Sequence, residues 1–330
     1  MLIGKIPPNI LQNQILPFVG AKRAEVIIGP KLGEDCTVLD LGEHLAVLST
    51  DPITGAVSGI GRLAVHISCN DIAATGAQPI GILLTVLLPP DTTEREIQEL
   101  MQDVHKTATQ LNVAILGGHT EITAAVKQVL IITTALGKVE REYLISSSGA
   151  QPGDDIILTK WAGLEGTAIL ATDLAHRLKT KLSESILTAA RSFSQHLSVV
   201  PEGITAARAG ATAMHDVTEG GIRGALVEIA AASNVGLEVW AEKIPLAPET
   251  EAICRYLQID PFGLISSGAM LITAPPDSKV MSALKAAAIP ARIIGRVIPA
   301  PELSLIENGV KQKLTAPVRD ELYVALERFQ

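Results

Sequence analysis

One aspartate lies in an otherwise apolar part of the sequence, the stretch HISCNDIAATGAQPIGILLTVLLP at residues 66–89. Asp71 is the one charged side chain there when His66 is neutral, and the small and apolar residues around it read as a helix ending near Gly76. An isolated buried carboxylate is costly unless another group pairs with it. The sequence therefore raises the question of what pairs with Asp71.

Acidic residues gather around this stretch without matching bases. Between Leu32 and Glu94 there are eight acidic residues and a single base, Arg62. Carboxylates that repel one another can be reconciled by a hard divalent cation, and Mg²⁺ takes oxygen ligands, usually one or two carboxylates plus substrate phosphates. The candidate metal ligands are Asp35 in GEDC, Asp51 in STDP and Asp71, whereas Asp40, Glu43, Asp91 and Glu94 are interpreted as solvated surface groups.

Two glycine-rich stretches follow predicted strands and are predicted to be turns. Turns of this kind expose backbone N–H groups, and a helix N-terminus favours anions, so both are candidate phosphate contacts. Both stretches also have purely structural explanations. The glycines can be required by a tight turn, and Thr218 can be the N-cap of the following helix. AILGGHTEI contains Gly117, Gly118, His119, Thr120 and Glu121, and HDVTEGGIRG contains Asp216, Thr218, Glu219, Gly220 and Gly221.

Composition excludes several classes of protein. A net charge of -8 with no basic tract argues against nucleic acid as a partner. No apolar run reaches the length of a membrane span, and Pro7 and Pro8 interrupt the place where a signal peptide needs an apolar core, so we expect a cytoplasmic protein without a membrane partner. The three cysteines form no CxxC motif and are expected to be buried apolar residues rather than disulfide partners.

The order of predicted elements indicates two domains of the α+β class, each of α/β type. Strands are expected at 45–50, 80–88 and in VAIL and VLIITTAL, with a helix from Thr93 to about Leu111 opened by a capping box with Glu96. The turn-rich ISSSGAQPGDD marks a boundary near residue 150. We therefore predict an N-terminal nucleotide- and metal-binding domain at 1–148 and a C-terminal α+β domain at 149–330.

Other nucleotide-binding motifs are absent or weak. The sequence has no GxxxxGK[ST] P-loop motif. The segment GIGRLA at 59–64 is a partial dinucleotide-binding motif, but it follows no convincing strand, which disfavours a dehydrogenase.

Taken as a set, the motifs resemble the aminoimidazole ribonucleotide synthetase (PurM-like) superfamily over nearly the whole chain. The motifs that carry the resemblance run in the order and approximate spacing of that superfamily; they are GEDC, STDPITG, CNDIAATGAQP, GGHTE, PGDDIILTK, HDVTEGGI and SSGAMLI. Within the superfamily the sequence is most similar to the hydrogenase maturation protein HypE and its uncharacterised relatives.

The resemblance implies a fold and an activity. It implies an N-terminal domain whose strands form a shared β-barrel in a homodimer, and ATP and Mg²⁺ as cofactors. By motif, Asp35, Asp51 and Asp71 would hold the metal, Gly117 and Gly118 would approach the phosphates beside His119 and Glu121, and Asp216 would face the acceptor. The implied chemistry is activation of an oxygen by phosphoryl transfer, on a small molecule or a group carried by a protein.

Departures from the pattern concern the acceptor. HypE proteins end in Pro-Arg-X-Cys and use the terminal thiol, whereas this sequence ends VALERFQ, and GGHTE has His119 where several relatives have an acid. We therefore expect no carbamoyl group to be accepted on this chain itself, and we expect the last ten residues to form a packed helix. The alternative to an enzyme is a non-catalytic nucleotide-binding dimer that acts as a partner or regulatory module.

Overall fold

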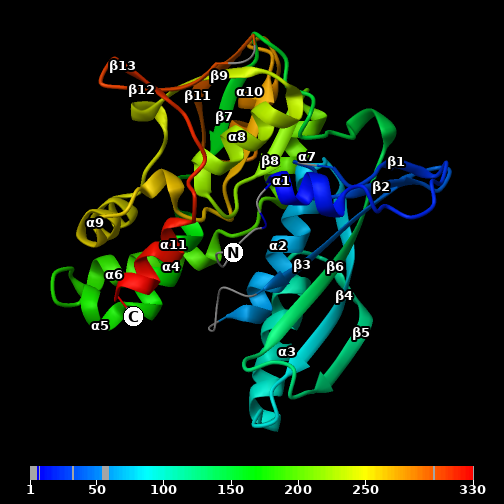
Figure 1. Cartoon of the computed structure of the whole chain (residues 1–330), viewed down its shortest axis with the longest axis vertical. Coiled ribbons are helices and arrows are strands. Elements are labelled where there is room, and N and C mark those ends of the chain that lie inside the picture. Colours follow the sequence, from blue (N-terminus) through cyan, green and yellow to red (C-terminus); the bar gives the residue numbers. More distant parts are fainter. Residues whose placement is uncertain (1–5, 7, 32, 54–58, 300–301, 330) are drawn as a thin grey trace.

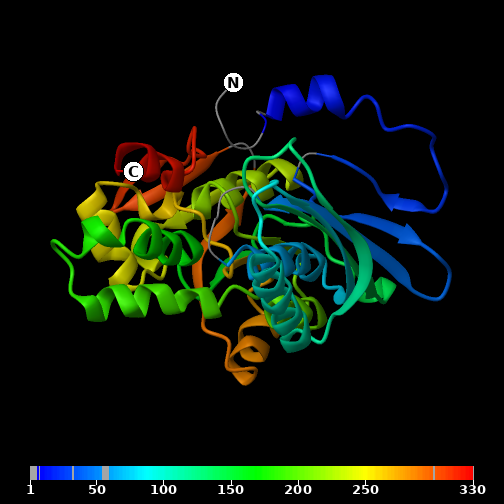
Figure 2. The same cartoon turned by 90° about the horizontal axis from the view of Figure 1, so that it is seen from below.

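The fold contains two β-sheets, one in each half of the chain (Figures 1 and 2). The computed structural model describes residues 6, 8–31, 33–53, 59–299 and 302–329. The first sheet has six strands in the order β1-β2-β3-β6-β4-β5, and the second has seven in the order β13-β12-β9-β11-β7-β10-β8. This arrangement confirms the α+β class predicted from the sequence.

The first sheet and its helices are formed by the N-terminal half. Its strands are β1 (Val26–Ile28), β2 (Thr37–Asp40), β3 (Leu45–Ile53), β4 (Gln78–Leu88), β5 (Ala114–Ile122) and β6 (Leu130–Val139). Its helical segments are α1 (Pro8–Ile10), the π-helical turn Leu11–Ile15, α2 (Ile60–Ala74) and α3 (Glu94–Gln110), and the short 3₁₀ segment Arg141–Tyr143 follows β6. Thr93 and Glu96 form the predicted capping box at the start of α3.

The second sheet is formed by the C-terminal half. Its strands are β7 (Asp155–Thr159), β8 (Ala213–Asp216), β9 (Gly236–Trp240), β10 (Met270–Ala274), β11 (Ala291–Ile298), β12 (Leu303–Glu307) and β13 (Val310–Lys313). Its helices are α4 (Leu164–Asp173), α5 (Ala175–Leu178), α6 (Glu184–Ser192), α7 (Val200–Arg208), α8 (Gly221–Ser233), α9 (Pro248–Leu257), α10 (Val280–Ala286) and α11 (Glu321–Phe329), with 3₁₀ turns at Phe193–Gln195, Ala241–Lys243 and Pro261–Gly263.

Both faces of the second sheet are covered by helices. Side chains of α8 share an apolar cluster with one face of β7 and β10, and side chains of α7 and α10 share another cluster with the opposite face. Ile156 and Ile157 of β7 lie one in each cluster, which agrees with the burial of this strand at every position. Helices α4, α6, α9 and α11 form a separate apolar cluster beside this layered unit.

The first sheet is covered on one face only. Helix α2 packs on β3 and β6, and α3 packs on α2 (Figure 1). In contrast, all nine residues of β5 are exposed, and among the described strands β5 pairs with β4 alone, in parallel. The glycine-rich stretch at 114–122, which the sequence predicted to contain a turn, is therefore a continuous edge strand; this prediction was wrong.

Glycine is required at position 118 of β5 because the backbone of the adjacent strand β4 lies very close to it. A Cβ atom at Gly118 would lie 1.9 Å from the carbonyl oxygen of Leu84 on β4, and Gly118 has a φ of +143°. Gly118 thus permits a close approach of the two strands, in a stretch that sequence reasoning interpreted as a turn.

The predictions for the cysteines and for the end of the chain are confirmed. Cys36, Cys69 and Cys254 are free and buried. The last described residues form α11, whose Leu322 and Ala325 are buried against α4 and its neighbours. No helix within the described part of the chain is long and apolar enough to cross a membrane.

The two halves are joined by helix α2, which packs against α7 of the C-terminal half. The Asn70 side chain accepts a hydrogen bond from the Val199 amide and donates one to the Leu197 carbonyl, both at 2.8 Å. Three residues along the helix, the backbone of Ala73 faces Gly203, where an added Cβ would lie 2.0 Å from the Ala73 oxygen. The α2–α7 crossing is therefore both hydrogen-bonded and closely packed.

We expect Gly203→Ala to destabilise the protein by about 1–3 kcal/mol, because the added methyl group must push α7 away from α2. Alanine is otherwise the better helix former by about 1 kcal/mol, so a loss of stability isolates the steric effect. The measurement is urea unfolding, with Thr205→Ala on the same helix as control. A Gly203→Ala protein as stable as the parent would show that the crossing tolerates a side chain.

Candidate active site

Four aspartates from separate parts of the chain meet at the junction of the two halves. Asp35 precedes β2, Asp51 lies near the end of β3, Asp71 lies on α2, and Asp216 ends β8. The charges of Asp35, Asp51 and Asp216 all act on the carboxyl of Asp71. The structure thus brings together the three residues predicted as metal ligands and the residue predicted to face the acceptor.

Asp71 is hydrogen-bonded by a hydroxyl group, and no cation among the described residues forms an ion pair with it. Its side chain is buried, and the Ser49 hydroxyl donates a hydrogen bond to its Oδ2 atom at 2.5 Å. Burial, followed by the charges of Asp216 and Asp51, raises the pKa of Asp71 well above its ordinary value. Without a metal ion the protein therefore favours a protonated Asp71, and ionisation of this group needs a nearby cation.

His215 supplies positive charge to the cluster. Its Nδ1 donates to the Asp216 carbonyl at 2.7 Å, and its Nε2 lies 3.2 Å from a carboxylate oxygen of Glu228. A carbonyl and a carboxylate both accept hydrogen bonds, so both ring nitrogens carry protons. Burial opposes that charge, but the hydrogen bond to Glu228 and the charges of Asp35, Glu228 and Asp216 raise the pKa of His215 to about 9.

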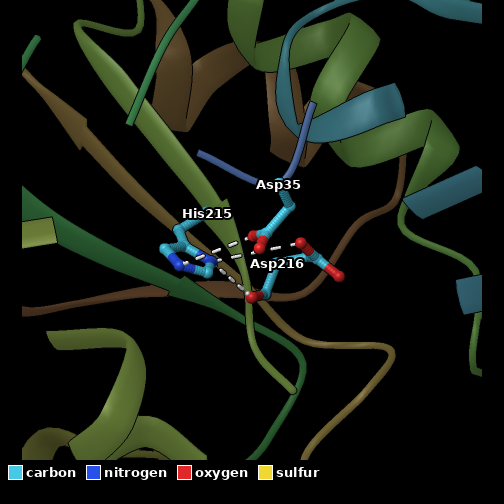
Figure 3. A group of neighbouring side chains, drawn as sticks. All are labelled: Asp35, His215 and Asp216. Atoms are coloured by element: carbon cyan, nitrogen blue, oxygen red, sulfur yellow. Dashed lines mark hydrogen bonds and ion pairs between the residues drawn. The ribbon is translucent and has the colours of Figure 1, made fainter. Parts of the chain in front are cut away.

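The geometry around His215 decides which residues suit a metal. Donor atoms of Asp35, His215 and Asp216 lie within 4.8 Å of one another, and Figure 3 shows the three side chains turned toward a common centre. An imidazolium has no lone pair for a metal, so His215 acts as a counter-charge and the carboxylates remain as the ligand candidates.

A cavity of about 170 Å³ opens beside the aspartates. Asp35, Asp51 and Asp71 line one side, and residues of the C-terminal half line the other, namely Glu165, Ile169, Thr218, Glu219, Ile265, Ser267, Leu322 and Tyr323. A smaller hollow of about 20 Å³, lined by Asp35, Asp71 and Asp216, continues from the same carboxylates. A larger cavity of about 530 Å³ lies apart from these aspartates, between α3 and the first turn of α2.

The turn in HDVTEGG is placed beside this cavity, as strand, turn and helix, which confirms the predicted local structure. Gly220 and Gly221 have φ values of +85° and +59°, which explains the pair of glycines. Their N–H groups already have acceptors: Gly220 donates to Asp320 Oδ2 at 2.6 Å, and Gly221 donates to the Thr218 carbonyl at 3.1 Å. Phosphate binding by these two glycines stays a prediction, and each N–H would have to exchange its present acceptor.

The GGHTE residues are not brought to the aspartates within one chain. Gly117, Gly118, His119, Thr120 and Glu121 lie along the exposed edge strand β5, and none of them lines the aspartate cavity. His119 Nε2 is 3.0 Å from Glu121 Oε2 on the outer surface of the sheet. A role for this stretch in phosphate binding stays a prediction and would require a second surface facing β5.

Sequence reasoning missed two residues of the site. His215 stood in the quoted HDVTEGG motif, and its position beside Asp216 was a usable signal. Glu165, in WAGLEGTAIL, gave a weaker signal: it is an acid in an apolar helix, as Asp71 is, but it follows a glycine turn in which an exposed acid is unremarkable.

Comparison with known proteins identifies the class to which this fold and site belong. The N-terminal domain of AIR synthase related proteins matches residues 33–139, and the C-terminal domain of the same family matches residues 151–308. The chain belongs to the AIR synthase related, or PurM-like, family, as the sequence motifs predicted.

The similar proteins include enzymes of two kinds, a dehydratase and a kinase. The chain is 30% identical to the carbamoyl dehydratase HypE of Cupriavidus necator over 72% of this chain and 68% of that protein. It is 32% identical to a thiamine-monophosphate kinase of Methanospirillum hungatei over 66% of this chain and 72% of the kinase. Among solved structures, Escherichia coli HypE superposes with a TM-score of 0.73 at 24% identity, covering 87% of this chain and 92% of that one.

Replacing Asp71 with asparagine is expected to stabilise the metal-free protein. A group whose folded pKa is raised contributes stability that is present below its unfolded pKa and is lost as the pH rises through the folded pKa. The gain from Asp71→Asn should therefore grow with pH, reaching on the order of 1–3 kcal/mol at neutral pH and above. Thermal unfolding in a chelator at about pH 5 and about pH 8 measures it.

Asp91→Asn, at an exposed position, is the control for this measurement. A stability difference between Asp71→Asn and the parent that is the same at both pH values would contradict the raised pKa of Asp71.

Proposed function

We propose that this chain is an ATP- and Mg²⁺-dependent enzyme that activates an oxygen of a small molecule or of a group on a partner protein by phosphoryl transfer. The observation that carries the proposal is the convergence of Asp35, Asp51, Asp71 and Asp216 on two cavities that share Asp35 and Asp71. Family members support the nucleotide: a HypE in complex with ATP matches with a TM-score of 0.70, and so does a thiamine-monophosphate kinase complexed with AMPPCP and TMP.

The donor set fits Mg²⁺. The candidate ligands are carboxylate oxygens, which Mg²⁺ prefers, and the raised pKa of Asp71 indicates a deficit of positive charge at that position. Asp35, Asp51 and Asp71 would hold the ion, with Asp216 beside them. When bound, Mg²⁺ supplies neutralisation of phosphate charge.

The chain's own residues have three functions in this proposal. Ser49 fixes the orientation of the Asp71 carboxyl through its hydrogen bond. The protonated His215 offsets the charges of Asp35 and Asp216. Apolar side chains on the cavity wall, including Leu63, Ile67 and Ile169, limit the water around the reacting groups.

The acceptor in this proposal is not a thiol of the chain. Cys36 is 5% exposed, Cys69 0% and Cys254 2%. Burial raises the pKa of Cys69 and of Cys254 to about 12, and burial together with the neighbouring aspartates raises the pKa of Cys36 well above its ordinary value. Thiols that are neither exposed nor ionised are poor nucleophiles, which supports a free molecule or a group on another protein as acceptor.

A solved complex of a structural relative supports a protein partner. One matching structure, with a TM-score of 0.74 at 20% identity, is a complex of HypE with HypF. Turnover with a partner-borne group would favour the enzyme, whereas ATP binding without turnover on any acceptor would favour the non-catalytic dimer.

Asp71→Asn should lower the affinity for ATP in the presence of Mg²⁺ by more than about tenfold, because it removes a buried ligand of the metal. Calorimetric titration with a non-hydrolysable ATP analogue measures the affinity. Asp91→Asn is the matched control and should bind as the parent does. Equal affinities for the parent and Asp71→Asn with Mg²⁺ present would exclude Asp71 as a ligand.

We also propose that the chain forms a homodimer through the exposed side chains of strands β4 and β5 of its first sheet. Apolar side chains are exposed on β4 and β5, namely Ile80, Leu83, Ile115, Leu116 and Ile122 at 38–60%. Such a patch on two adjacent strands is typical of an interface.

We expect light scattering at micromolar concentration to give the dimer mass for the parent and the monomer mass for Leu116→Glu, since a buried charge at the interface is unfavourable. Val318→Glu is the control, because Val318 is 96% exposed outside this sheet. A monomeric parent would contradict the dimer.

A further inference from the structure

Glu165 is a buried carboxyl on the cavity wall opposite the aspartates. It lies in the first turn of α4 and is 6% exposed. Its Oε2 atom has no hydrogen-bond partner among the described residues, although the atom is buried and the residue lines the 170 Å³ cavity. Leaving such an atom unsatisfied is costly, and in a native protein it commonly indicates a group that is supplied from outside.

The first turn of α4 holds Glu165 in place. The Gly163 amide donates to the Ser266 hydroxyl at 2.6 Å, and the Gly166 amide donates to the Ile265 carbonyl at 3.0 Å. A Cβ at Gly166 would lie 2.5 Å from the Leu264 side chain, so the first turn of α4 packs closely against Leu264. Glu165 interacts with Ser267, while its Oε2 atom has no hydrogen-bond partner among the described residues.

The cavity next to Glu165 has a clear charge preference. Among the described residues that line it there is no lysine, arginine or histidine, and the C-terminal side offers only carboxyl and hydroxyl groups with apolar side chains. A group that enters between Glu165 and the aspartates thus meets hydrogen-bond acceptors and negative charge on both sides. An anionic group would be repelled there, whereas an uncharged group with N–H or O–H donors would satisfy the carboxyl.

Glu165 also borders a second, smaller space. A cavity of about 70 Å³ between α2 and α4 shares Leu63, Glu165 and Ile169 with the first cavity. The arginines of this region, Arg62 and Arg191, line the second cavity and not the first. The carboxyl thus stands at the boundary of the two spaces.

We propose that Glu165 is an acceptor-binding residue, which receives a hydrogen bond from the uncharged, N–H- or O–H-bearing end of the group that is activated and discriminates against an anionic group of the same shape. This inference rests on the proposed function, since it places the acceptor between Glu165 and the nucleotide. Burial raises the pKa of Glu165 to about 7, an effect that its interaction with Ser267 only partly offsets, so a donor group in the cavity would favour its ionised form.

A purely structural role makes a different prediction. A buried neutral acid that merely fills space would change stability when it is replaced, and would leave the choice between two isosteric small molecules unaltered. The readout must therefore be a ratio of two probes in the same protein preparation, which does not depend on how much of the protein is folded.

The test uses acetamide and acetate as matched probes, with methyl carbamate as a second uncharged amide. First, calorimetry measures binding of a non-hydrolysable ATP analogue with Mg²⁺ to the parent, to Glu165→Gln and to the control Glu94→Gln, at an exposed position of α3. Next, the rate of ADP release from ATP is measured against probe concentration, and the slopes for acetamide and acetate are divided.

We expect the parent and Glu94→Gln to prefer both amides to acetate, and Glu165→Gln to lose this preference by more than about tenfold while its affinity for the ATP analogue stays within about twofold. An unchanged preference in Glu165→Gln, or no ADP release by the parent with either amide, would overturn the assignment of Glu165. Failure of the parent to bind the nucleotide would instead overturn the proposed function.

Discussion

The electrostatic repulsion among carboxylates at the junction of the two halves is the constraint on which the site depends. Asp35, Asp51, Asp71 and Asp216 come from a loop, a strand, a helix and the end of another strand, so the whole fold is needed to hold them together. The chain offsets this repulsion only in part, through Ser49 and the protonated His215. The repulsion that remains uncompensated in the folded protein favours the binding of a cation.

Much of the fold could be predicted because local patterns agree with the tertiary structure. The capping box of Thr93 and Glu96, the apolar runs of β4 and β6 and the turn-rich segment before β7 are signals in sequence that the structure reproduces. Asp71 was recognisable for a physical reason: a carboxylate in an apolar helix needs an explanation in any fold.

The errors arose where glycine has more than one use. In β5, Gly118 permits close pairing with β4, whereas in HDVTEGG two glycines form a turn, and the local sequence does not distinguish these cases. Glu165 and His215 were missed because their roles depend on what lies across the junction. The partners of His215, for example, include Glu228 on the following helix and Asp35 from the other half of the chain.

The contact between α2 and α7 limits how a substrate can reach the site. Asn70 forms hydrogen bonds with the backbone of Leu197 and Val199, and Ala73 lies against Gly203. The adjacent Asp71 lines the cavity. Opening the molecule along this seam would break both hydrogen bonds and pull Asp71 from its neighbours. A substrate must therefore enter without separating α2 from α7, and Ile169 of α4 and Tyr323 of α11 line the cavity on elements that take no part in this contact.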